Sequence, residues 1–588
     1  MIRIFRASRS FQRPCSESLK RNWSSHLRSF LLNSQIAYVS RFQLGTIAKW
    51  KEQLGGSRLE VFPNLQRGEL ANSFFESIKD HETNLVDSSA LLGMISKAGI
   101  AYTDPRLSSF MAALRNISNS RREPEHTDTL HGLKMDKEEF FRVTQGDLSM
   151  LLRVAVNDFC IPDFPAFKER IKQLYEQCSG CHQGHVANYI PQLAKVDPDL
   201  WAVSICTVDG QRVSYGDSTS PFTLQSASKP LSYALALTEL GSEEVHKYVG
   251  YEPSGVPFNQ ISLNSKNRPH NPLINSGAIA VASLLQMNLS RPERFVYVHD
   301  KFSELAGRES LGFNNAVYLS ERATADRNYA IAYYMRENGC FPQNSELDAT
   351  MDLYFQMCSL ESTCEAAAVI YGTLANGGIN PLTGERILST EAVRDTLSVM
   401  HSCGMYDYSG QFAFRVGLPA KSGVSGLIVL VIPNLMGIAL WSPRINHQGN
   451  SVRGIHFCEK LIQNYVFHNY ESQLHHRSKV DPRKQNLEDK THAVVNLLFA
   501  ASNNDVNALR RCMLAGYDLN MADYDGRTGL HVAASVGAFE SVRFFLEVAR
   551  VNPEPKDRWG HSPQSEAKLF GHHAICDYFE RLHEKNEK

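Results

Sequence analysis

The sequence predicts a multidomain protein in which an α/β domain follows an all-α segment and precedes helical repeats. Apolar residues recur at helical spacing over residues 70–180, so this segment is expected to be helical. Residues 185–475 combine short β-branched runs with apolar stretches of helical composition, which is typical of an α/β domain. Residues 494–586 repeat with a period near 33, and a chain of 588 residues is long enough for several domains.

Residues 1–60 are expected to form a disordered leader rather than part of a fold. Residues 1–35 contain six arginines and eight serines but a single acid, Glu17. This composition is typical of a mitochondrial transit peptide, and a basic disordered tail is the alternative. We therefore expect the protein to reside in the mitochondrion, in the matrix.

The overall composition argues against two classes of partner. The net charge of −1 provides no global field that would attract nucleic acid or an anionic membrane surface. No apolar run reaches the roughly 18 residues that a membrane span requires. The 12 cysteines lack the spacing of a disulfide framework, which indicates a reducing compartment.

Two patterns before residue 185 resemble ligand-binding motifs, but each lacks some of the residues that such a site requires. The stretch from Asp136 to Phe141 resembles the start of an EF-hand helix, but no calcium-loop pattern precedes it, so we expect an EF-hand-like bundle over 70–180 without calcium. Cys178, Cys181 and His182 match the Cys-x-x-Cys-His of covalent haem attachment, but the chain has one copy and no further thiolates at metal-ligand spacing. We interpret this run as coincidental and expect no metal and no cofactor.

A hydroxyl and an amine three residues apart form the centre of the α/β domain. Ser226 and Lys229 stand where an extended segment turns into an apolar helix, and positions i and i+3 share a helix face. A serine is a weak nucleophile that needs a neighbouring base, and a lysine can be that base if burial or charge lowers its pKa. Residues 200–206 and 211–215 are predicted strands joined by a hairpin turn at Asp209 and Gly210.

A second motif supports this interpretation. Lys421-Ser422-Gly423 precedes the buried strand predicted over residues 426–433. Ser-x-x-Lys followed along the chain by Lys-Ser-Gly or Lys-Thr-Gly is similar to the pattern of penicillin-binding proteins and serine β-lactamases. The domain is therefore expected to have a serine β-lactamase-like fold, with helices around a mixed antiparallel sheet.

Residues 185–475 closely resemble the glutaminase family, and nearly all of the chain after about residue 70 resembles its mitochondrial kidney- and liver-type animal members. Six motifs carry the resemblance: Pro191-Gln192-Leu193-Ala194, Leu224-Gln225-Ser226 with Lys229-Pro230, His270-Asn271-Pro272 through Gly277-Ala278, Asp326-Arg327-Asn328, Leu374-Ala375-Asn376-Gly377-Gly378 and Leu418-Pro419-Ala420-Lys421-Ser422-Gly423. The resemblance implies hydrolysis of L-glutamine to L-glutamate and ammonia. Two alternatives stay open, namely another acyl-serine hydrolase of the same fold and a catalytically dead ankyrin scaffold.

The resemblance also implies a role for individual residues. Ser226 would form a glutamyl ester, with Lys229 as base and Tyr406 as a proton relay whose pKa a nearby lysine would lower. The backbone N–H groups of Ser226 and Val424 would form the oxyanion hole. The residues that the family match places against substrate are Tyr189, Gln225, Ser226, Asn275, Glu321, Asn328, Tyr354, Tyr406 and Val424. A free amino acid needs amide and hydroxyl donors for its carboxylate and an acid such as Glu321 for its ammonium group.

One loop departs from the kidney-type pattern. The segment containing Phe258, Gln260, Ile261, Ser262 and Leu263 resembles the family's regulatory loop. Ser262 stands where kidney-type members place a bulky aromatic residue, and Gln260 replaces a lysine. We expect activation by inorganic phosphate to be retained and sensitivity to the inhibitors that bind at that aromatic residue to be weakened. The resemblance also implies homodimers that assemble into tetramers or filaments.

The C-terminal part is predicted to consist of a linker and ankyrin repeats. Residues 478–492 are polar and charged, as expected of a linker. In residues 494–586, Ala501-Ser502 recurs as Ala534-Ser535, and Asp523 is followed 34 residues later by Asp557, which indicates about three ankyrin units. Such repeats would either bind a protein partner or stabilise the catalytic domain.

Overall fold

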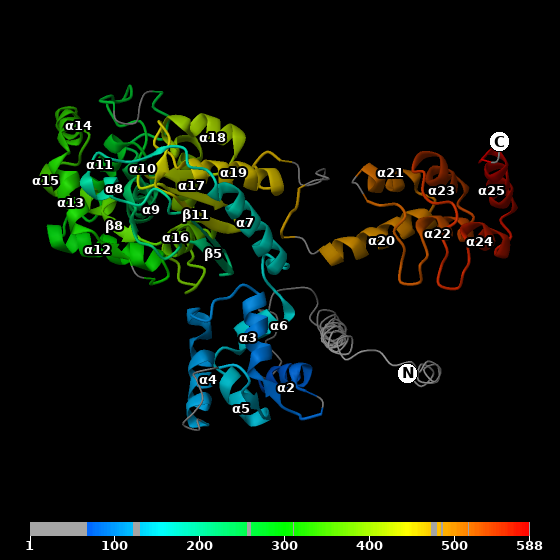
Figure 1. The fold of residues 1–588 in the computed structure, drawn as a ribbon. Helices are drawn as coiled ribbons and strands as arrows, with labels where there is room; N and C mark the ends of the chain where they lie inside the picture. Colours follow the sequence, from blue (N-terminus) through cyan, green and yellow to red (C-terminus); the bar gives the residue numbers. More distant parts are fainter. Residues whose placement is uncertain are drawn as a thin grey trace, which may run out of the picture. The chain divides into compact units, whose positions relative to one another are not determined.

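The computed structural model describes residues 67–586 except 81, 122–129, 256–259, 310, 472–478, 484–485 and 515–516. The predicted leader, residues 1–60, lies outside the described residues. The chain divides into two compact units, one containing residues up to Ile95 together with Arg106–Asp158, and the other containing Ser96–Pro105 and the chain from Phe159 onward (Figure 1).

The first unit is helical apart from one short strand pair. Its elements are α2 (Arg67–Ile78), β1 (Val86–Asp87), α3 (Ser88–Lys97), η2 (Pro105–Leu107), α4 (Ser108–Ser120), β2 (Lys134–Met135), α5 (Lys137–Thr144) and α6 (Leu148–Val156). β1 and β2 pair antiparallel, with Val86 opposite Met135. Helix α5 begins after Asp136, whose carboxylate accepts the backbone N–H of Glu139 at 2.9 Å in a capping box. The helical spacing in the sequence predicted the helices, but the two-residue strand pair was not predicted.

Helix α7 (Phe164–Ser179) belongs to the second unit, whereas the predicted domain boundary at residue 180 placed it in the helical bundle. Its apolar face, which includes Phe164 and Ile171, packs in one cluster with sheet residues such as Val203 and Ile428. An amphipathic helix fits a bundle or a sheet equally well, so its sequence did not specify the partner.

The second unit is organised around a five-stranded antiparallel sheet with the order β5-β4-β11-β10-β9. The strands are β4 (Ala202–Thr207), β5 (Arg212–Gly216), β9 (Ala420–Ser422), β10 (Leu427–Ile432) and β11 (Met436–Trp441). The hairpin predicted at Asp209 and Gly210 joins β4 to β5, with Ile205 opposite Val213. Residues of β4, β10 and β11 are buried along their whole length.

Helices cover both faces of this sheet (Figure 1). On β10, Leu427, Val429 and Val431 pack in the cluster that contains α16 (Cys364–Ala375). The alternate residues of β10 pack in the cluster that contains α7 and α19 (Val452–Asn464). Because both faces are buried, the strand is a continuous apolar run rather than an alternation of polar and apolar residues.

Helix α16 approaches the sheet at backbone contact distance. A Cβ added at Gly437 of β11 would lie 2.2 Å from the nitrogen of Gly372 and 2.3 Å from the carbonyl carbon of Tyr371. Two glycines facing each other therefore set the depth at which α16 packs, and this depth fixes the position of the Tyr371 side chain.

Smaller elements complete the second unit up to residue 470. Three short strands form a separate sheet in the order β6-β8-β7, comprising β6 (Phe222–Thr223), β8 (Leu360–Ser362) and β7 (Gly312–Phe313), and β12 (Arg444–Ile445) pairs with β3 (His185–Val186). The remaining elements are α8 (Pro191–Ala194), η3 (Gln225–Ser228), α9 (Lys229–Leu240), α10 (Ser242–Val245), α11 (Asn275–Leu284), α12 (Arg291–Leu305), α13 (Asn315–Ala323), α14 (Asp326–Glu337), α15 (Leu347–Cys358), α17 (Thr390–Cys403), η4 (Tyr406–Tyr408) and α18 (Ser409–Arg415).

The C-terminal part consists of stacked helix pairs. Its helices are α20 (Asn486–Ser502), α21 (Val506–Leu514), α22 (Gly529–Val536), α23 (Phe539–Arg543) continuing into the π-helix η5 (Phe544–Val548), α24 (Pro563–Leu569) and α25 (His573–Asn586). The 34-residue period corresponds to two like hairpins, in which Asp523 and Asp557 each accept two backbone N–H groups. Helix α20 begins inside the predicted linker 478–492, because a polar segment that contains Leu487, Glu488 and Lys490 is also compatible with a helix.

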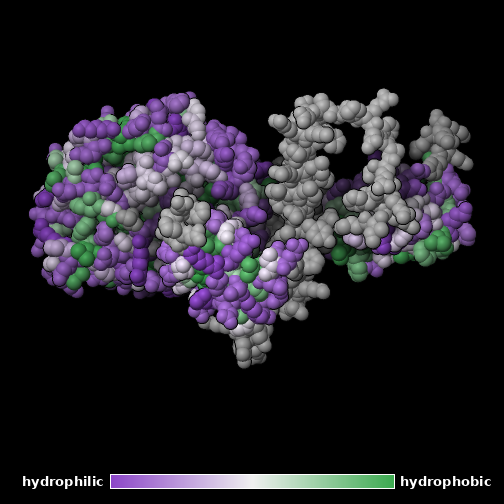
Figure 2. Space-filling model, turned by 60° about the horizontal axis from the view of Figure 1, so that its bottom comes forward, coloured by the Kyte–Doolittle hydropathy of each residue, from purple (hydrophilic) through white to green (hydrophobic). Residues whose placement is uncertain are grey.

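The described surface is mainly hydrophilic on the face that Figure 2 shows, with hydrophobic residues in small groups. Among the described residues, no helix combines the length and the apolar character that crossing a bilayer requires.

We predict that Gly437→Ala destabilises the second unit by about 1–3 kcal/mol, because the new methyl group would overlap the backbone of α16. The measurement is denaturant unfolding followed by the fluorescence of Trp201 and Trp441, which lie in the same unit. Gly410→Ala on α18 is the matched control, since its Cβ would meet nothing within 4 Å. Equal unfolding midpoints for the two variants would contradict the prediction.

Candidate active site

Ser226 lies in the short turn η3, between β6 and helix α9. The backbone N–H of Leu224 donates to the carbonyl of Leu360 on β8, so the small sheet guides the chain into this turn. In a 3₁₀ turn the side chains at i and i+3 eclipse, which places Ser226 and Lys229 on one side. Gln225 has a φ of 49°, a left-handed conformation that costs a non-glycine residue energy.

Buried hydrogen bonds hold the turn in place. The hydroxyl of Tyr371 on α16 donates to the carbonyl of Ala227 at 2.6 Å. The hydroxyl of Ser228 donates to the carbonyl of Gln225 at 2.8 Å. The close approach of α16 to the sheet therefore also determines where the Ser226 hydroxyl stands.

Lys229 is the first residue of α9 and is only 2% exposed. Its Nζ donates to Oδ1 of Asn275, the first residue of α11, at 2.7 Å. Burial lowers the pKa of Lys229 to about 8, although electrostatic interactions with Cys358 and Glu321 oppose the shift. An amine with this pKa is substantially unprotonated near neutral to mildly alkaline pH and can accept a proton.

Tyr406 lies in the turn η4, where its hydroxyl is close enough to the Ser226 side chain to affect the pKa of the phenol. Its φ is 52°, and the Ser409 hydroxyl donates to its carbonyl at 2.7 Å. Burial raises the pKa of Tyr406 and outweighs the opposing effect of Ser226. This corrects the lowered pKa expected from the sequence, because the cost of desolvating a phenolate exceeds the effect of neighbouring groups.

Tyr189, Glu321 and Gln225 form a hydrogen-bonded group beside the turn. The hydroxyl of Tyr189, which precedes α8, donates to Oε1 of Glu321 on α13 at 2.6 Å and lies 3.3 Å from Oε1 of Gln225. Burial raises the pKa of Glu321, opposed by its hydrogen bonds with Tyr189 and Gln225 and by the charge of Lys229. Tyr189 remains 47% exposed, so this group borders an opening to solvent.

The other predicted binding residues lie around the same point. Nδ2 of Asn275 donates to Oδ1 of Asn328 on α14 at 3.0 Å. Tyr354 is buried on α15, where its pKa is raised by burial and by electrostatic interactions with Cys358, Glu321 and Tyr406. Gly449 borders both Val424 and the Tyr406 ring, since its Cβ would lie 4.0 Å and 3.5 Å from them.

Two residues of this site were not on the list of predicted site residues. Lys421 is buried on β9, its Nζ 4.5 Å from the centroid of the Tyr406 ring, and its pKa is lowered by burial and by the charge of Lys229. The Lys-Ser-Gly motif was the signal for it. Cys358, four residues after Tyr354 on α15, hydrogen-bonds with Tyr354 and Ser228, and burial raises the pKa of its thiol to about 12. No sequence motif marked this cysteine.

Of the predicted regulatory loop, Phe258 lies outside the described residues. Gln260 and Ile261 are exposed, while Ser262 and Leu263 are half-buried. A cavity of about 430 Å³ next to this loop is lined by Pro253, Ser254, Gly255, Asn271, Leu273, Ile274, Ser402, Cys403, Tyr406, Asp407, Ser409 and Gly410. Tyr406 thus lies between this cavity and Ser226.

The Cys178–His182 run lies at the end of α7. Cys178 is buried in the cluster beneath the sheet, and Arg453 donates to the carbonyl of Cys181 at 2.8 Å. His182 is exposed, with Nδ1 3.2 Å from Oδ1 of Asp199. These contacts join the loop to α19.

A half-buried serine beside a buried lysine, on a β-lactamase-like fold, is the arrangement typical of acyl-serine hydrolases. The sequence model of the family described as glutaminase matches residues 184–470. The chain is 48% identical over 490 residues to the mitochondrial liver isoform of glutaminase from Mus musculus, covering 83% of this chain and 80% of that protein. The chain belongs to the glutaminase family and is a glutamine-hydrolysing amidohydrolase.

Further relationships concern individual parts. A glutaminase from a Nostoc strain is 45% identical over 302 residues, which are 51% of this chain and 89% of that protein. A crystal structure of Mglu in its L-glutamate binding form has a TM-score of 0.50 and 38% identity, covering 52% of this chain and 70% of that chain. An EF-hand domain matches residues 70–162, and three copies of the ankyrin repeat match residues 497–586. The two alternatives to a glutaminase are not favoured by these findings.

We predict that Tyr371→Phe lowers kcat for glutamine hydrolysis about tenfold or more, because the nucleophile turn loses the hydroxyl that fixes Ala227. Tyr233→Phe is the matched control, since the buried Tyr233 hydroxyl contacts His246 and not the turn η3. Ammonia release under saturating glutamine is the readout. An equal kcat for both variants would show that the hydrogen bond does not position the serine.

Proposed function

We propose that the chain hydrolyses L-glutamine through a glutamyl ester on Ser226, with Lys229 as the general base. The observation that carries this proposal is the buried Nζ of Lys229, whose pKa near 8 lies well below the usual range of a lysine, three residues after a serine in a tight turn. A hydroxyl beside a neutral amine can lose its proton as it attacks a carbonyl carbon.

In the first half-reaction, Oγ of Ser226 attacks the side-chain amide carbon of glutamine, and its proton passes to Lys229. The C–N bond of the amide then breaks, and the leaving group takes a proton to depart as ammonia. Tyr406 contacts Ser226 and is neutral because burial raises its pKa, so it is suited to donate this proton and to recover it from Lys229. In the second half-reaction, water attacks the ester and releases glutamate.

Backbone groups near Ser226 are proposed to stabilise the oxyanion. A Cβ at Gly423 would lie 3.0 Å from the carbonyl oxygen of Leu224 and 3.6 Å from the nitrogen of Ala227, so the end of β9 runs along the nucleophile turn. This close approach supports the assignment of the N–H groups of Ser226 and Val424 to the oxyanion hole. Such preorganised donors contribute about 3–4 kcal/mol each to transition-state binding.

We assign recognition of the free amino acid to the groups around the turn. Glu321, held by Tyr189, is placed to receive the ammonium group of the substrate. Asn275, Asn328 and Tyr354 provide amide and hydroxyl groups for the carboxylate. The structural neighbour solved in an L-glutamate binding form supports a site for the product amino acid. This chemistry uses side chains and backbone N–H groups of the chain itself, so we propose no cofactor.

Location, assembly and regulation are proposed from weaker observations. The Arg- and Ser-rich composition of residues 1–35 and the mitochondrial name of the mouse relative support import into the mitochondrial matrix. We propose homodimers that form tetramers or filaments, activation by inorganic phosphate, and weak response to inhibitors that need an aromatic residue at Ser262. The cavity that Tyr406 lines also contains Pro253, Ser254 and Gly255, which precede the loop in the chain, and this supports control of activity from this side. The ankyrin repeats support a protein partner.

We predict that protein lacking residues 1–60 releases ammonia from L-glutamine, that inorganic phosphate increases the rate, and that Ser226→Ala abolishes it. Without the hydroxyl no ester can form, and the residual rate should be at least about 1,000-fold lower. Normal turnover by the Ser226→Ala variant would eliminate the proposed nucleophile. A rate that phosphate leaves unchanged would eliminate the proposed activator alone.

We predict that kcat/KM rises about tenfold per pH unit well below pH 8 and levels off above it, because only the neutral amine of Lys229 accepts the proton. The charge of Glu321 raises the pKa of Lys229, so Glu321→Gln should move the inflection to lower pH as well as weaken binding. The measurement is the initial rate at low glutamine from pH 6 to 9. A flat profile would show that Lys229 is not the base.

A further inference from the structure

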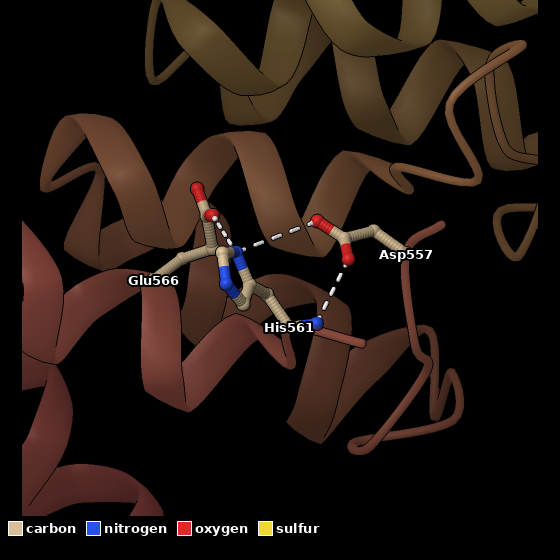
Figure 3. Close-up of side chains that lie close together, drawn as sticks. All are labelled: Asp557, His561 and Glu566. Carbon is tan, nitrogen blue, oxygen red and sulfur yellow. Dashed lines mark hydrogen bonds and ion pairs between the residues drawn. The ribbon is translucent and has the colours of Figure 1, made fainter. Parts of the chain in front are cut away.

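Three potential metal ligands converge in the last ankyrin repeat (Figure 3). Asp557 and His561 lie in the hairpin before α24, and Glu566 lies in the first turn of that helix. Nδ1 of His561 is 3.3 Å from Oε1 of Glu566 and 3.8 Å from Oδ2 of Asp557. The three ligand atoms all lie within 4.8 Å of one another, and in the part of the chain that the structure describes no other such group occurs.

The two oxygens of Asp557 have different environments. Oδ1 accepts the backbone N–H groups of Trp559 at 2.9 Å and His561 at 2.8 Å, which shapes the hairpin. Asp557 is only 6% exposed, and its Oδ2 is buried without a hydrogen-bond donor among the described residues. A buried carboxylate oxygen without a donor is costly, and Oδ2 faces the other two ligands.

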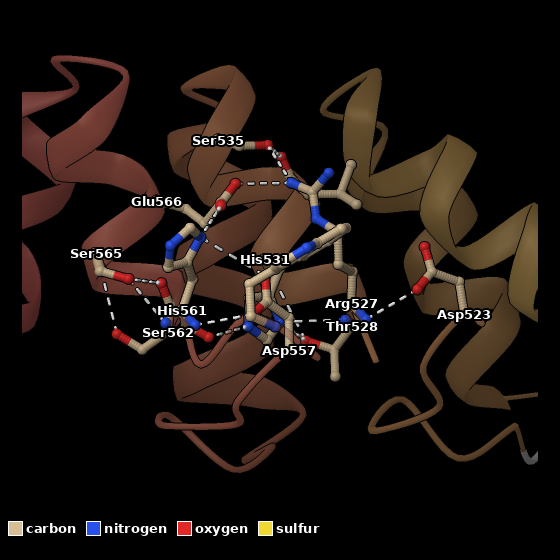
Figure 4. A network of polar contacts seen from close by, with 12 residues as sticks. Asp523, Arg527, Thr528, His531, Ser535, Asp557, His561, Ser562, Ser565 and Glu566 are labelled. Atoms are coloured by element: carbon tan, nitrogen blue, oxygen red, sulfur yellow. Dashed lines mark hydrogen bonds and ion pairs between the residues drawn. The ribbon is translucent and has the colours of Figure 1, made fainter. Parts of the chain in front are cut away.

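Glu566 and His561 each form a hydrogen bond with a residue outside the cluster (Figure 4). Arg527 donates to Oε2 of Glu566 at 2.7 Å, which leaves Oε1 facing His561. The carbonyl of His561 is 3.1 Å from Nε2 of the buried His531 and accepts the N–H of Asp557 at 3.0 Å. The ring of His561 is half-exposed, so an ion could reach the cluster from solvent.

The preceding repeat shows that the hairpin itself does not require these residues. Asp523 occupies the position of Asp557 and accepts the equivalent N–H groups at 2.9 Å. Thirty-four residues before His561 and Glu566, the chain has Arg527 and Val532. The same turn therefore forms with an arginine and a valine, and the fold does not dictate an imidazole and a second carboxylate in the last repeat.

We propose that Asp557, His561 and Glu566 bind one divalent transition-metal ion, with zinc as the best match, and leave a fourth position for water. One imidazole and two carboxylates are ligands that zinc accepts, and tetrahedral bonds of about 2.0–2.2 Å place ligand atoms about 3.3–3.6 Å apart. The observed separations require side-chain shifts of an ångström or less. The ion would fasten the hairpin to α24 and stabilise the terminal repeat. This proposal differs from the sequence-based expectation of no metal. That expectation arose because the spacing of Asp557, His561 and Glu566 matches no known metal motif.

The test uses the full chain after treatment with a chelator. Cobalt(II) is added as the probe, its d–d absorption reports tetrahedral coordination, and zinc is then added to displace it. Asp557→Asn is the sharpest variant, because its Oδ1 can still accept both hairpin N–H groups while Nδ2 replaces the ligand oxygen. His561→Ala removes a half-exposed ligand, and His573→Ala removes an exposed histidine outside the cluster as the matched control.

We expect the wild-type chain and His573→Ala to bind one cobalt ion per chain, which zinc displaces. In Asp557→Asn and His561→Ala the affinity for cobalt should be at least about tenfold weaker. Zinc should also raise the midpoint of thermal unfolding of the terminal repeat in the wild-type chain and in His573→Ala alone. Cobalt binding that is equal in all four proteins would place the ion elsewhere and overturn the proposal. So would stability that falls in the two cluster variants with no response to metal, since the cluster would then be an ion-pair network of Arg527, Glu566 and His561.

Discussion

The dehydration of one ammonium group is the constraint on which the catalytic part depends. Lowering the pKa of Lys229 from 10.5 to about 8 corresponds to about 3 kcal/mol of unfavourable free energy for the charged form. The surrounding residues limit this cost without removing it, because Asn275 accepts from Nζ and Glu321 lies close enough to attract the charge. A fully compensated lysine would be stable and protonated, and it would be useless as a base.

The fold meets this constraint by bringing separate segments of the chain to one turn. The small sheet delivers Ser226, α16 holds Ala227 through Tyr371, and β9 runs along the other side of the turn. Each of these segments is itself fixed by packing, and the approach of α16 to Gly437 leaves no room for a side chain there. The geometry of the site therefore depends on glycines and apolar strands that take no part in the chemistry.

Local patterns predicted the features that depend on neighbours in the chain. The serine–lysine spacing, the hairpin at Asp209 and Gly210 and the apolar run of β10 are of this kind, and the structure contains all three. The short motifs also identified the residues that gather around Ser226. The ankyrin period was visible because each hairpin is built from the same local hydrogen bonds.

Features that depend on tertiary surroundings could not be predicted in this way. The direction of the Tyr406 pKa follows from how deeply the phenol is buried, and no spacing in the sequence reports that depth. Cys358 reaches the site only because α15 is packed beside the turn. The partner of α7 and the meeting of Asp557, His561 and Glu566 likewise follow from packing rather than from sequence spacing.

The left-handed backbone at Gln225 and Tyr406 brings two requirements, stability and activity, into conflict. Both residues flank the Ser226 hydroxyl, and both hold a conformation that glycine would adopt without strain. Selection for resistance to heat alone would favour glycine at either position, whereas the proposed reaction uses the Tyr406 hydroxyl and the proposed binding site uses Gln225. Under this proposal, directed evolution for stability should be screened for activity in every round, because glycine at either position removes a group that the reaction is proposed to use.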